Sequence, residues 1–217
     1  MKLLMVLLLS VAFMGLLVKP QAKISAQYIP GQTTIAVLPS VNTTTDKWKQ
    51  LIIEEGEYAR MHVYKMFTMR GFQSIDPSKV DNAISKLNID MNDENQWSKD
   101  NFVSIGKESG ADLVAFVLIK QVQAKNVGNF LISWKESDAQ IEVWLLDVND
   151  GKMLIDDKSA RGKAKASTGE TIKPRDLRAV KFAVEDAYKK WLSSYPLLSN
   201  HKKTNSNEID GNSGVGK

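Results

Sequence analysis

Segments with a strand-like pattern alternate with segments with a helix-like pattern along this chain. Residues 33–38 (TTIAVL) form a β-branched, apolar run that stops at Pro39, which predicts a buried first strand. From residue 47 to residue 69 the apolar positions recur at steps of three and four, which predicts a long amphipathic helix. Gly71 follows, as a glycine often does after a helix.

The middle of the chain predicts one short strand and two further helices. Residues 72–75 are short and extended, and Asp76 followed by Pro77 is typical of a capped helix start. A third helix is predicted over residues 98–109, where Gly110 ends it.

The second half predicts three strands and a last helix. Residues 112–119 (DLVAFVLI) form the most hydrophobic strand candidate, so we expect them at the centre of the sheet. Residues 139–148 alternate between apolar and other positions, and the turn signal at residues 149–151 (NDG) returns the chain along residues 152–164. Pro174 opens the final amphipathic helix.

The predicted order is therefore β-α-β-α-α-β-β-β-α. Helices that cover an apolar mixed β-sheet make a single α/β domain, which we place at residues 27–198. Residues 199–217 are rich in Asn, Ser, Gly and Lys, and this composition predicts a disordered tail because it buries too little apolar surface to fold.

The first 26 residues have the layout of a secretory signal peptide. Lys2 gives a basic start, residues 3–18 carry no charge, and small residues follow up to Ala26. The apolar run is shorter than the roughly 20 residues of a comfortable membrane span. We therefore expect a periplasmic or secreted protein without a membrane span after cleavage, with an uncleaved N-terminal membrane anchor as the alternative.

Charge argues against a nucleic-acid partner. The chain carries 29 basic and 25 acidic residues, a net charge of +4, but cleavage after Ala26 would remove Lys2, Lys19 and Lys23 and leave 26 basic residues. A nucleic-acid-binding surface is expected to keep a strong positive excess.

The absence of cysteine excludes several kinds of chemistry. With no cysteine in the sequence there is no disulfide, no thiolate catalysis, no thiolate metal site and no lipid anchor on an N-terminal cysteine. An exported domain without disulfides fits a bacterial cell envelope better than a small eukaryotic secreted module.

Candidate catalytic and metal-binding residues are sparse. His62 and His201 have no metal-ligand spacing, and no nucleophile-elbow, zinc-protease or P-loop motif is present. A group of four aspartates surrounds the predicted hairpin without the spacing of a calcium loop, and the tight turn itself favours them: Asp147, Asp150, Asp156 and Asp157. We expect no catalytic residue, no metal and no cofactor.

Two segments are candidates for partner binding. Arg161, Lys163 and Lys165 share one face of the predicted strand, where they could meet an anionic surface or protect an edge strand against unwanted pairing. The connection at residues 126–138 contains apolar side chains that either extend the hairpin strands or form a contact patch for a protein: Phe130, Leu131, Ile132 and Trp134.

Three segments together resemble a known family. The strand TTIAVLP opens the domain, residues 105–114 (IGKESGADLV) read like an IGKxxGAD helix-to-strand junction, and residues 141–157 (IEVWLLDVNDGKMLIDD) read like a hairpin with a central Asp and Gly. This set resembles the bacterial envelope superfamily that includes the curli secretion lipoprotein CsgG, the TolB N-terminal domain and the lipoprotein activators of penicillin-binding proteins. The resemblance spans residues 33–192 and implies a TolB-N/CsgG-like fold.

The same resemblance implies a non-enzymatic periplasmic role, either binding another envelope protein or self-association into rings. It carries over no active residue, and the chain lacks the acylated cysteine of the pore-forming branch. The motif residues also have physical roles: Gly110 and Gly151 permit positive φ, and Asp112 can accept backbone N–H groups.

The leading hypothesis is an exported, non-catalytic interaction module for envelope assembly, secretion or cell-wall maintenance. One alternative is a secreted hydrolase that uses two facing carboxylates among Asp112, Asp147 and Asp156. Another is a carrier of a small ligand, which needs a concave pocket lined by Trp and Met residues.

Overall fold

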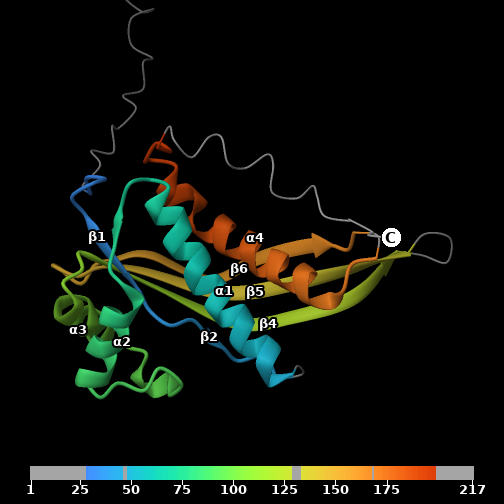
Figure 1. Cartoon of the computed structure of the whole chain (residues 1–217), viewed down its shortest axis with the longest axis horizontal. Helices are drawn as coiled ribbons and strands as arrows, with labels where there is room; N and C mark the ends of the chain where they lie inside the picture. The colour runs from blue at the N-terminus through green and yellow to red at the C-terminus, as the bar shows by residue number, and fades with distance from the viewer. Residues whose placement is uncertain (1–27, 46–47, 129–132, 168, 199–217) are drawn as a thin grey trace, which may run out of the picture.

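The structure is a computed structural model that describes residues 28–45, 48–128, 133–167 and 169–198. Within this part of the chain one mixed β-sheet has the strand order β3-β1-β4-β5-β6, with β2 beside β4 (Figure 1). The strands are β1 (Thr34–Val37), β2 (Val41–Asn42), β3 (Gln73–Ser74), β4 (Leu113–Gly128), β5 (Ser133–Asp147) and β6 (Met153–Lys165). Pairing is parallel around β1 and β2 and antiparallel from β4 to β6.

Helices pack on both faces of this sheet, so the predicted α/β fold class and element order are confirmed. They are α1 (Lys49–Thr68), α2 (Pro77–Lys86), the 3₁₀ turn η1 (Glu94–Gln96), α3 (Lys99–Ser109) and α4 (Ile172–Leu192). The hydrophobic strand β4 lies in the middle of the order, as its sequence predicted. The sequence did not predict β2 or η1, since both are too short to show a periodic pattern.

The larger core lies between the sheet and the parallel helices α1 and α4. Alternate residues of β4 point into it, among them Leu113, Val117 and Ile119, and each is fully buried. Glu54 pairs with Lys173 at 2.6 Å and His62 contacts Glu185 at 3.2 Å, so the two helices run in the same direction.

The smaller core lies on the opposite face, under α2 and α3. The intervening β4 residues Val114, Phe116 and Leu118 supply its floor. Gly106 of α3 sits so close to the sheet that a Cβ there would lie 2.5 Å from a methyl of Val148. The smaller core reaches no further along β4 than Leu118. One end of the sheet therefore has helices on both faces, whereas the other end has no α2–α3 layer.

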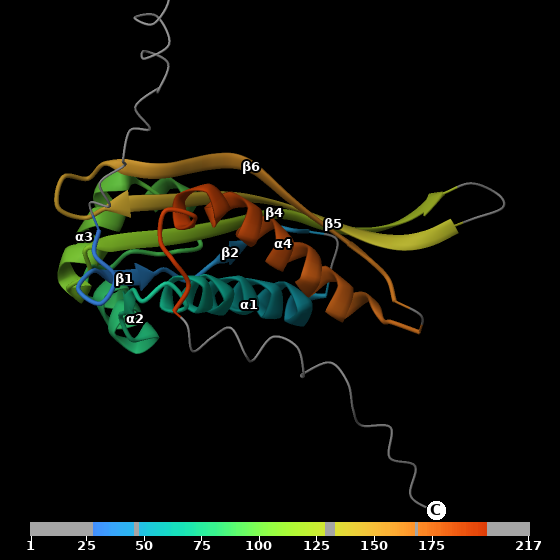
Figure 2. The same ribbon diagram turned by 90° about the horizontal axis from the view of Figure 1, so that it is seen from above.

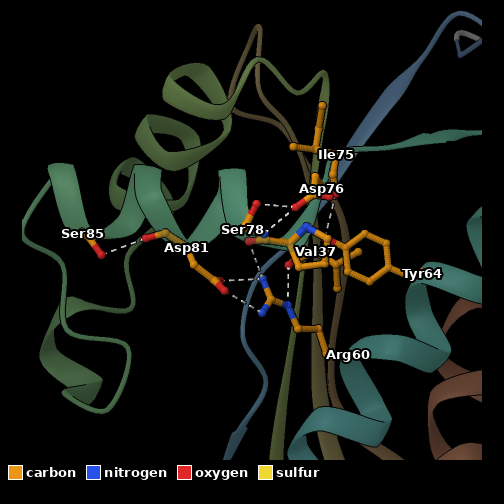
Figure 3. Close-up of polar contacts among 9 residues, drawn as sticks. Val37, Arg60, Tyr64, Ile75, Asp76, Ser78, Asp81 and Ser85 are labelled. Atoms are coloured by element: carbon orange, nitrogen blue, oxygen red, sulfur yellow. Dashed lines mark hydrogen bonds and ion pairs between the residues drawn. The ribbon is translucent and has the colours of Figure 1, made fainter.

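An ion pair connects the helices of the two layers. Arg60 of α1 donates to the carbonyl oxygen of Val37 at 3.1 Å and pairs with Asp81 of α2 at 2.7 Å (Figure 3). Nearby, the hydroxyl of Tyr64 donates to the carbonyl oxygen of Ile75 at 2.9 Å. These contacts fix α1 against α2 beside the start of the sheet.

The motif residues have the conformations that the sequence predicted. Gly110 and Gly151 adopt φ of 76° and 65°. The carboxylate of Asp112 accepts the backbone N–H of Thr34 at 2.8 Å, which ties the starts of β1 and β4 together. The side chain of Asp76 caps α2 by accepting the N–H of Ser78 at 2.8 Å.

Two boundaries differ from the prediction. β4 and β5 extend to Gly128 and back from Ser133, well beyond the apolar runs at residues 112–119 and 139–148. The apolar runs stop earlier because only one face of these extensions is buried. Of the two interpretations of residues 126–138, extension of the hairpin strands is the one seen in the described residues. α4 begins at Ile172, and its first turn tolerates Pro174 because the N–H of that position has no helical partner.

The predicted signal peptide, the predicted tail and His201 lie outside the described residues. So do Phe130, Leu131 and Ile132. In the part of the chain that is described, no helix combines the length and the apolar character needed to cross a bilayer.

Candidate partner-binding surface

The hairpin of β4 and β5 projects beyond the helices α2 and α3 (Figure 2). Its register runs from Gln121 opposite Gln140 to Gly128 opposite Ser133, and β6 continues beside it as far as Lys165 opposite Glu136. The two faces of this extension have different environments, and the contrast follows from the alternation of side chains along a strand.

The side chains on the face toward α4 are buried and mostly small. It consists of Val122, Ser137, Ala139, Ala160, Gly162 and Ala164. A Cβ at Gly162 would overlap with the carbonyl oxygen of Ala179 and the backbone nitrogen of Ala183. The backbone of α4 therefore lies directly on β6, and the side chains between these buried positions must point to the other side.

We call that other side the open face. It consists of Gln121, Gln123, Lys125, Val127, Trp134, Glu136, Asp138, Gln140, Arg161, Lys163 and Lys165. Both glutamines of β4 and all three cations of β6 are exposed, whereas Glu136 and Asp138 between them are buried or half-buried. The open face is thus a polar surface on a rigid sheet, and no described helix covers it.

Charges on the open face are arranged in cross-strand rows. In one row, Glu136 of β5 lies between Lys125 of β4 and Lys165 of β6. In the next row, Asp138 of β5 lies opposite Lys163 of β6. The ammonium of Lys125 is 3.0 Å from Asp138 and 3.8 Å from Glu136. Lys125 therefore partly neutralises both carboxylates, and the cations of β6 remain in excess.

Arg161, Lys163 and Lys165 form a cationic stripe along the edge strand, on one face as the sequence predicted. No described carboxylate forms an ion pair with any of the three. The ammonium of Lys165 lies 4.7 Å from the ring centre of Trp134, a cation–π distance. The structure thereby places the two segments that were predicted as candidates for partner binding in contact with each other.

Trp134 is half-buried at the far end of the open face. Its indole N–H is buried and has no hydrogen-bond partner among the described residues. Tryptophan and arginine are enriched among residues that dominate binding energies at interfaces. Phe130 and Ile132, the other two candidates of this segment, are not among the described residues.

A hollow of about 490 Å³ lies at the near end of the open face, where the α2–α3 layer stops. Trp97, Phe116 and Trp144 line it together with the ion pair of Lys120 and Glu142, whose N–O distance is 2.6 Å. Sequence reasoning missed this aromatic wall, because its members come from three separate segments that only the fold brings together.

The carboxylate of Glu142 is held in its charged form. Burial opposes ionisation of Glu142, but hydrogen bonds from Lys120 and from the indole of Trp144 outweigh it and lower the pKa of the carboxyl group. The wall therefore carries a fixed anion beside its rings, which distinguishes this end from the cationic stripe.

Two of the three aspartates considered for hydrolysis form hydrogen bonds within the domain. Asp147 is buried, accepts the hydroxyl of Tyr28 at 2.6 Å and accepts the N–H of Asn149 at 2.7 Å. The carboxylate of Asp112 is engaged by Thr34, and the side chain of Asp156 is exposed on β6. These bonds agree with the turn and strand roles that the sequence favoured for Asp112 and Asp147.

The other described titratable residues that were considered for catalysis or metal binding also have partners within the domain. Asp150 and Asp157 accept backbone N–H groups of Lys152 and Ser159. His62 stacks on Tyr58 and contacts Glu185. Among the described residues no group of three or more metal-ligating side chains is present.

A second hollow bears on the carrier hypothesis. Its volume is about 870 Å³, it lies between β6 and the end of α4, and its aromatic lining is Tyr28, Trp191 and Tyr195. The methionines expected in such a pocket are elsewhere, since Met66 and Met69 line a separate groove between α1 and α4.

Comparisons with known proteins give matches in structure alone. No family model matches the sequence, and no curated protein matches it. Lipoprotein GNA1162 from Neisseria meningitidis is similar at 12% identity over 74% of this chain and 99% of that one, with a TM-score of 0.49.

Two further solved structures are similar over most of the domain. The LpoB C-terminal domain from Salmonella enterica shares 13% identity over 65% of this chain and 87% of that one, with a TM-score of 0.39. The PelC dodecamer from Paraburkholderia phytofirmans shares 14% identity over 72% of this chain and 90% of that one, with a TM-score of 0.41. Likeness at this level concerns the fold, and the resemblance to CsgG and TolB remains a prediction.

Proposed function

We propose that this chain is an exported, non-catalytic interaction module of the bacterial envelope that binds a protein partner through its open face. The observation that carries the proposal is the cationic stripe beside Trp134, on a sheet face without a described helical cover. The signal-like layout of residues 1–26 supports export.

The chemistry of the open face indicates what the partner presents. Three exposed cations without described counter-ions favour a surface rich in Asp and Glu, because complementary charge steers association and selects among partners. Trp134 at one end and the Trp97–Trp144 wall at the other provide apolar area for anchoring side chains. Envelope assembly, secretion and cell-wall maintenance are the processes in which such a module would serve.

The edge position of β6 also permits the simpler reading that the stripe protects the sheet against unwanted pairing. The two readings differ in what charge removal does. If the stripe only protects, replacing its cations with neutral residues promotes self-association and leaves partner capture intact. If it binds, partner capture is lost.

Cross-linked affinity capture from intact cells tests the proposal. The wild-type chain is compared with Arg161→Gln/Lys163→Gln and with Lys49→Gln/Lys107→Gln, which removes the same charge from exposed positions elsewhere. We expect one envelope protein with the wild type and the control variant, and its loss with the stripe variant. Equal recovery from all three would reject the open face as the binding surface.

A carrier role is the second candidate, because the hollow beside Tyr28, Trp191 and Tyr195 is large enough for a small ligand. Native mass spectrometry of the chain purified from its own cells tests this role. A bound small molecule that is lost in Trp191→Ala would favour the carrier reading over the interaction module.

A further inference from the structure

Exposed apolar side chains gather at the end of the domain where both described termini lie. Ile29, Leu197 and Leu198 are 53%, 42% and 46% exposed. They belong to segments far apart in the sequence, and the fold brings them to the same place as the end of α1. We call these three residues the terminal patch.

Backbone hydrogen bonds and close contacts hold the patch together around Gly71. The N–H of Gly31 donates to the carbonyl oxygen of Gly71 at 2.7 Å, and the N–H of Leu198 donates to that of Met69 at 3.0 Å. A Cβ at Gly71 would lie 3.1 Å from Pro30 and 3.6 Å from a methyl of Leu198. The patch is therefore built on fixed backbone.

Cations surround one side of the patch. Leu197 lines a groove of about 480 Å³ between α1 and α4, and four cations line the same groove: Lys65, Arg70, Lys181 and Lys189. The groove holds two carboxylates, of which Glu185 faces His62 and Lys181. Positive charge remains in excess beside the exposed apolar side chains.

We infer that the terminal patch and its cations dock the domain on the surface of an anionic lipid bilayer. Apolar side chains that enter the interface and cations that meet lipid headgroups are the combination by which proteins lie on membranes. A protein partner would also accept the apolar residues, but the sequence that leads into the patch favours lipid.

That sequence is the uncharged run of residues 3–18, which precedes Tyr28 by ten residues. Ten residues span at most roughly 35 Å. Tyr28 itself is fixed in the domain, since its ring lies 5.9 Å from that of Trp191 and its hydroxyl bonds to Asp147. In the alternative in which residues 3–18 are retained as an N-terminal anchor, this run would hold the terminal patch close to the bilayer surface, and the patch's own chemistry suits that contact.

Docking through the terminal patch would orient the domain on the bilayer. The start of β1 and the end of α4 lie toward one end of the sheet, and the end of β4 and the start of β5 lie at the other (Figures 1 and 2). A domain docked by the terminal patch would point the far end of the open face away from the bilayer. The inference itself does not depend on partner binding at the open face.

Site-specific dye labelling of the full chain tests the inference, because the sequence contains no cysteine to interfere. Leu198→Cys places an environment-sensitive dye in the patch, and Trp48→Cys places it at the 85% exposed position before the other end of α1. The chain is reconstituted with vesicles of phosphatidylcholine, or of phosphatidylcholine with phosphatidylglycerol, each containing brominated lipid as quencher.

We expect several-fold stronger quenching at position 198 than at position 48, and a further increase at position 198 when phosphatidylglycerol is present. Lys65→Gln/Lys189→Gln should reduce that quenching, and Lys49→Gln/Lys107→Gln should not. Equal quenching at positions 198 and 48 would overturn the inference. Quenching that is the same without phosphatidylglycerol, or without the charges of Lys65 and Lys189, would overturn the preference for anionic lipid. A blue-shifted dye that brominated lipid does not quench would indicate a protein contact and would overturn lipid docking.

Discussion

The ammonium of Lys165 lies 4.7 Å above the ring of Trp134, so the last cation of the edge strand is fixed to the aromatic residue at the start of β5. The contact joins the neighbouring strands β5 and β6 on the open face, and it orients a tryptophan whose indole N–H has no partner among the described residues. Cation and ring together make a preformed contact point, which costs less to order on binding than two mobile side chains.

Lys165→Gln tests the energetic part of this contact. Loss of a half-exposed cation–π contact should lower the free energy of unfolding by about 0.5 kcal/mol, and Lys165→Arg should retain it. Urea unfolding of both variants measures the difference. A Lys165→Gln variant that is more stable than Lys165→Arg would contradict the contact.

The close approach of α4 to β6 predicts a large effect at Gly162. Gly162→Ala forces a methyl group into the backbone of α4 at Ala179 and Ala183, and it should destabilise the domain by about 3 kcal/mol or more. Lys163→Ala, one residue along on the open face, should change the free energy of unfolding by less than about 0.5 kcal/mol. Denaturant unfolding of the pair provides the comparison, and similar midpoints would refute the proposed helix–strand packing.

For a buried polar cluster at the start of α4 we expect that removing one charge destabilises the domain more than removing both charges. Arg175 is 1% exposed and donates to the hydroxyl of Ser137 at 2.7 Å, and that hydroxyl donates to the buried Asp176. Arg175→Ala leaves buried acceptors without this donor and should cost about 3 kcal/mol or more. Arg175→Met/Asp176→Asn, which removes both charges, should cost less than the single variant, and the reverse order would disprove the account.

His62 predicts a pH dependence of stability. Burial lowers the pKa of His62, and the attraction of Glu185 only partly offsets it. A histidine with a depressed pKa binds its proton more weakly in the folded state, so its stabilising contribution is complete above the unfolded pKa of about 6.5 and is lost as the pH falls below that value.

NMR titration checks this prediction directly, because the chain has only two histidines. His62 should titrate at lower pH than His201, which the sequence places in the predicted tail. The loss of stability between pH 7.5 and pH 5 should be smaller in His62→Gln than in the wild type. A His62 that titrates above His201 would show that the attraction of Glu185 dominates.

Sequence patterns predicted the fold wherever a pattern follows from burial on one side of an element. Residues 112–119 lie in the middle of the sheet because they are apolar on both faces, and Gly110 and Asp112 take their predicted roles at the junction before β4. The extensions of β4 and β5 were only one of two interpretations of residues 126–138, because their open face is polar and their inner face uses small residues such as Ser137 and Ala139.

The candidate surface was predictable in part. Alternation along β6 placed Arg161, Lys163 and Lys165 on one face, but no local pattern could show that Trp134 reaches Lys165 across the strands. The wall of Trp97 and Trp144 depends on where the α2–α3 layer ends, which is a property of tertiary packing. The local periodicity of a strand shows which of its side chains share a face. Only the assembled sheet shows which side chains of different strands contact each other.

Photo-cross-linking in intact cells tests the central claim most directly. A photoreactive residue is placed at Lys163 on the open face and, for comparison, at Gln50 on the exposed side of α1. We predict one discrete adduct with an envelope protein from position 163, none of that adduct from position 50, and its loss when Trp134→Ala is added. No adduct from position 163, or the same adduct from both positions, would contradict partner binding by the open face.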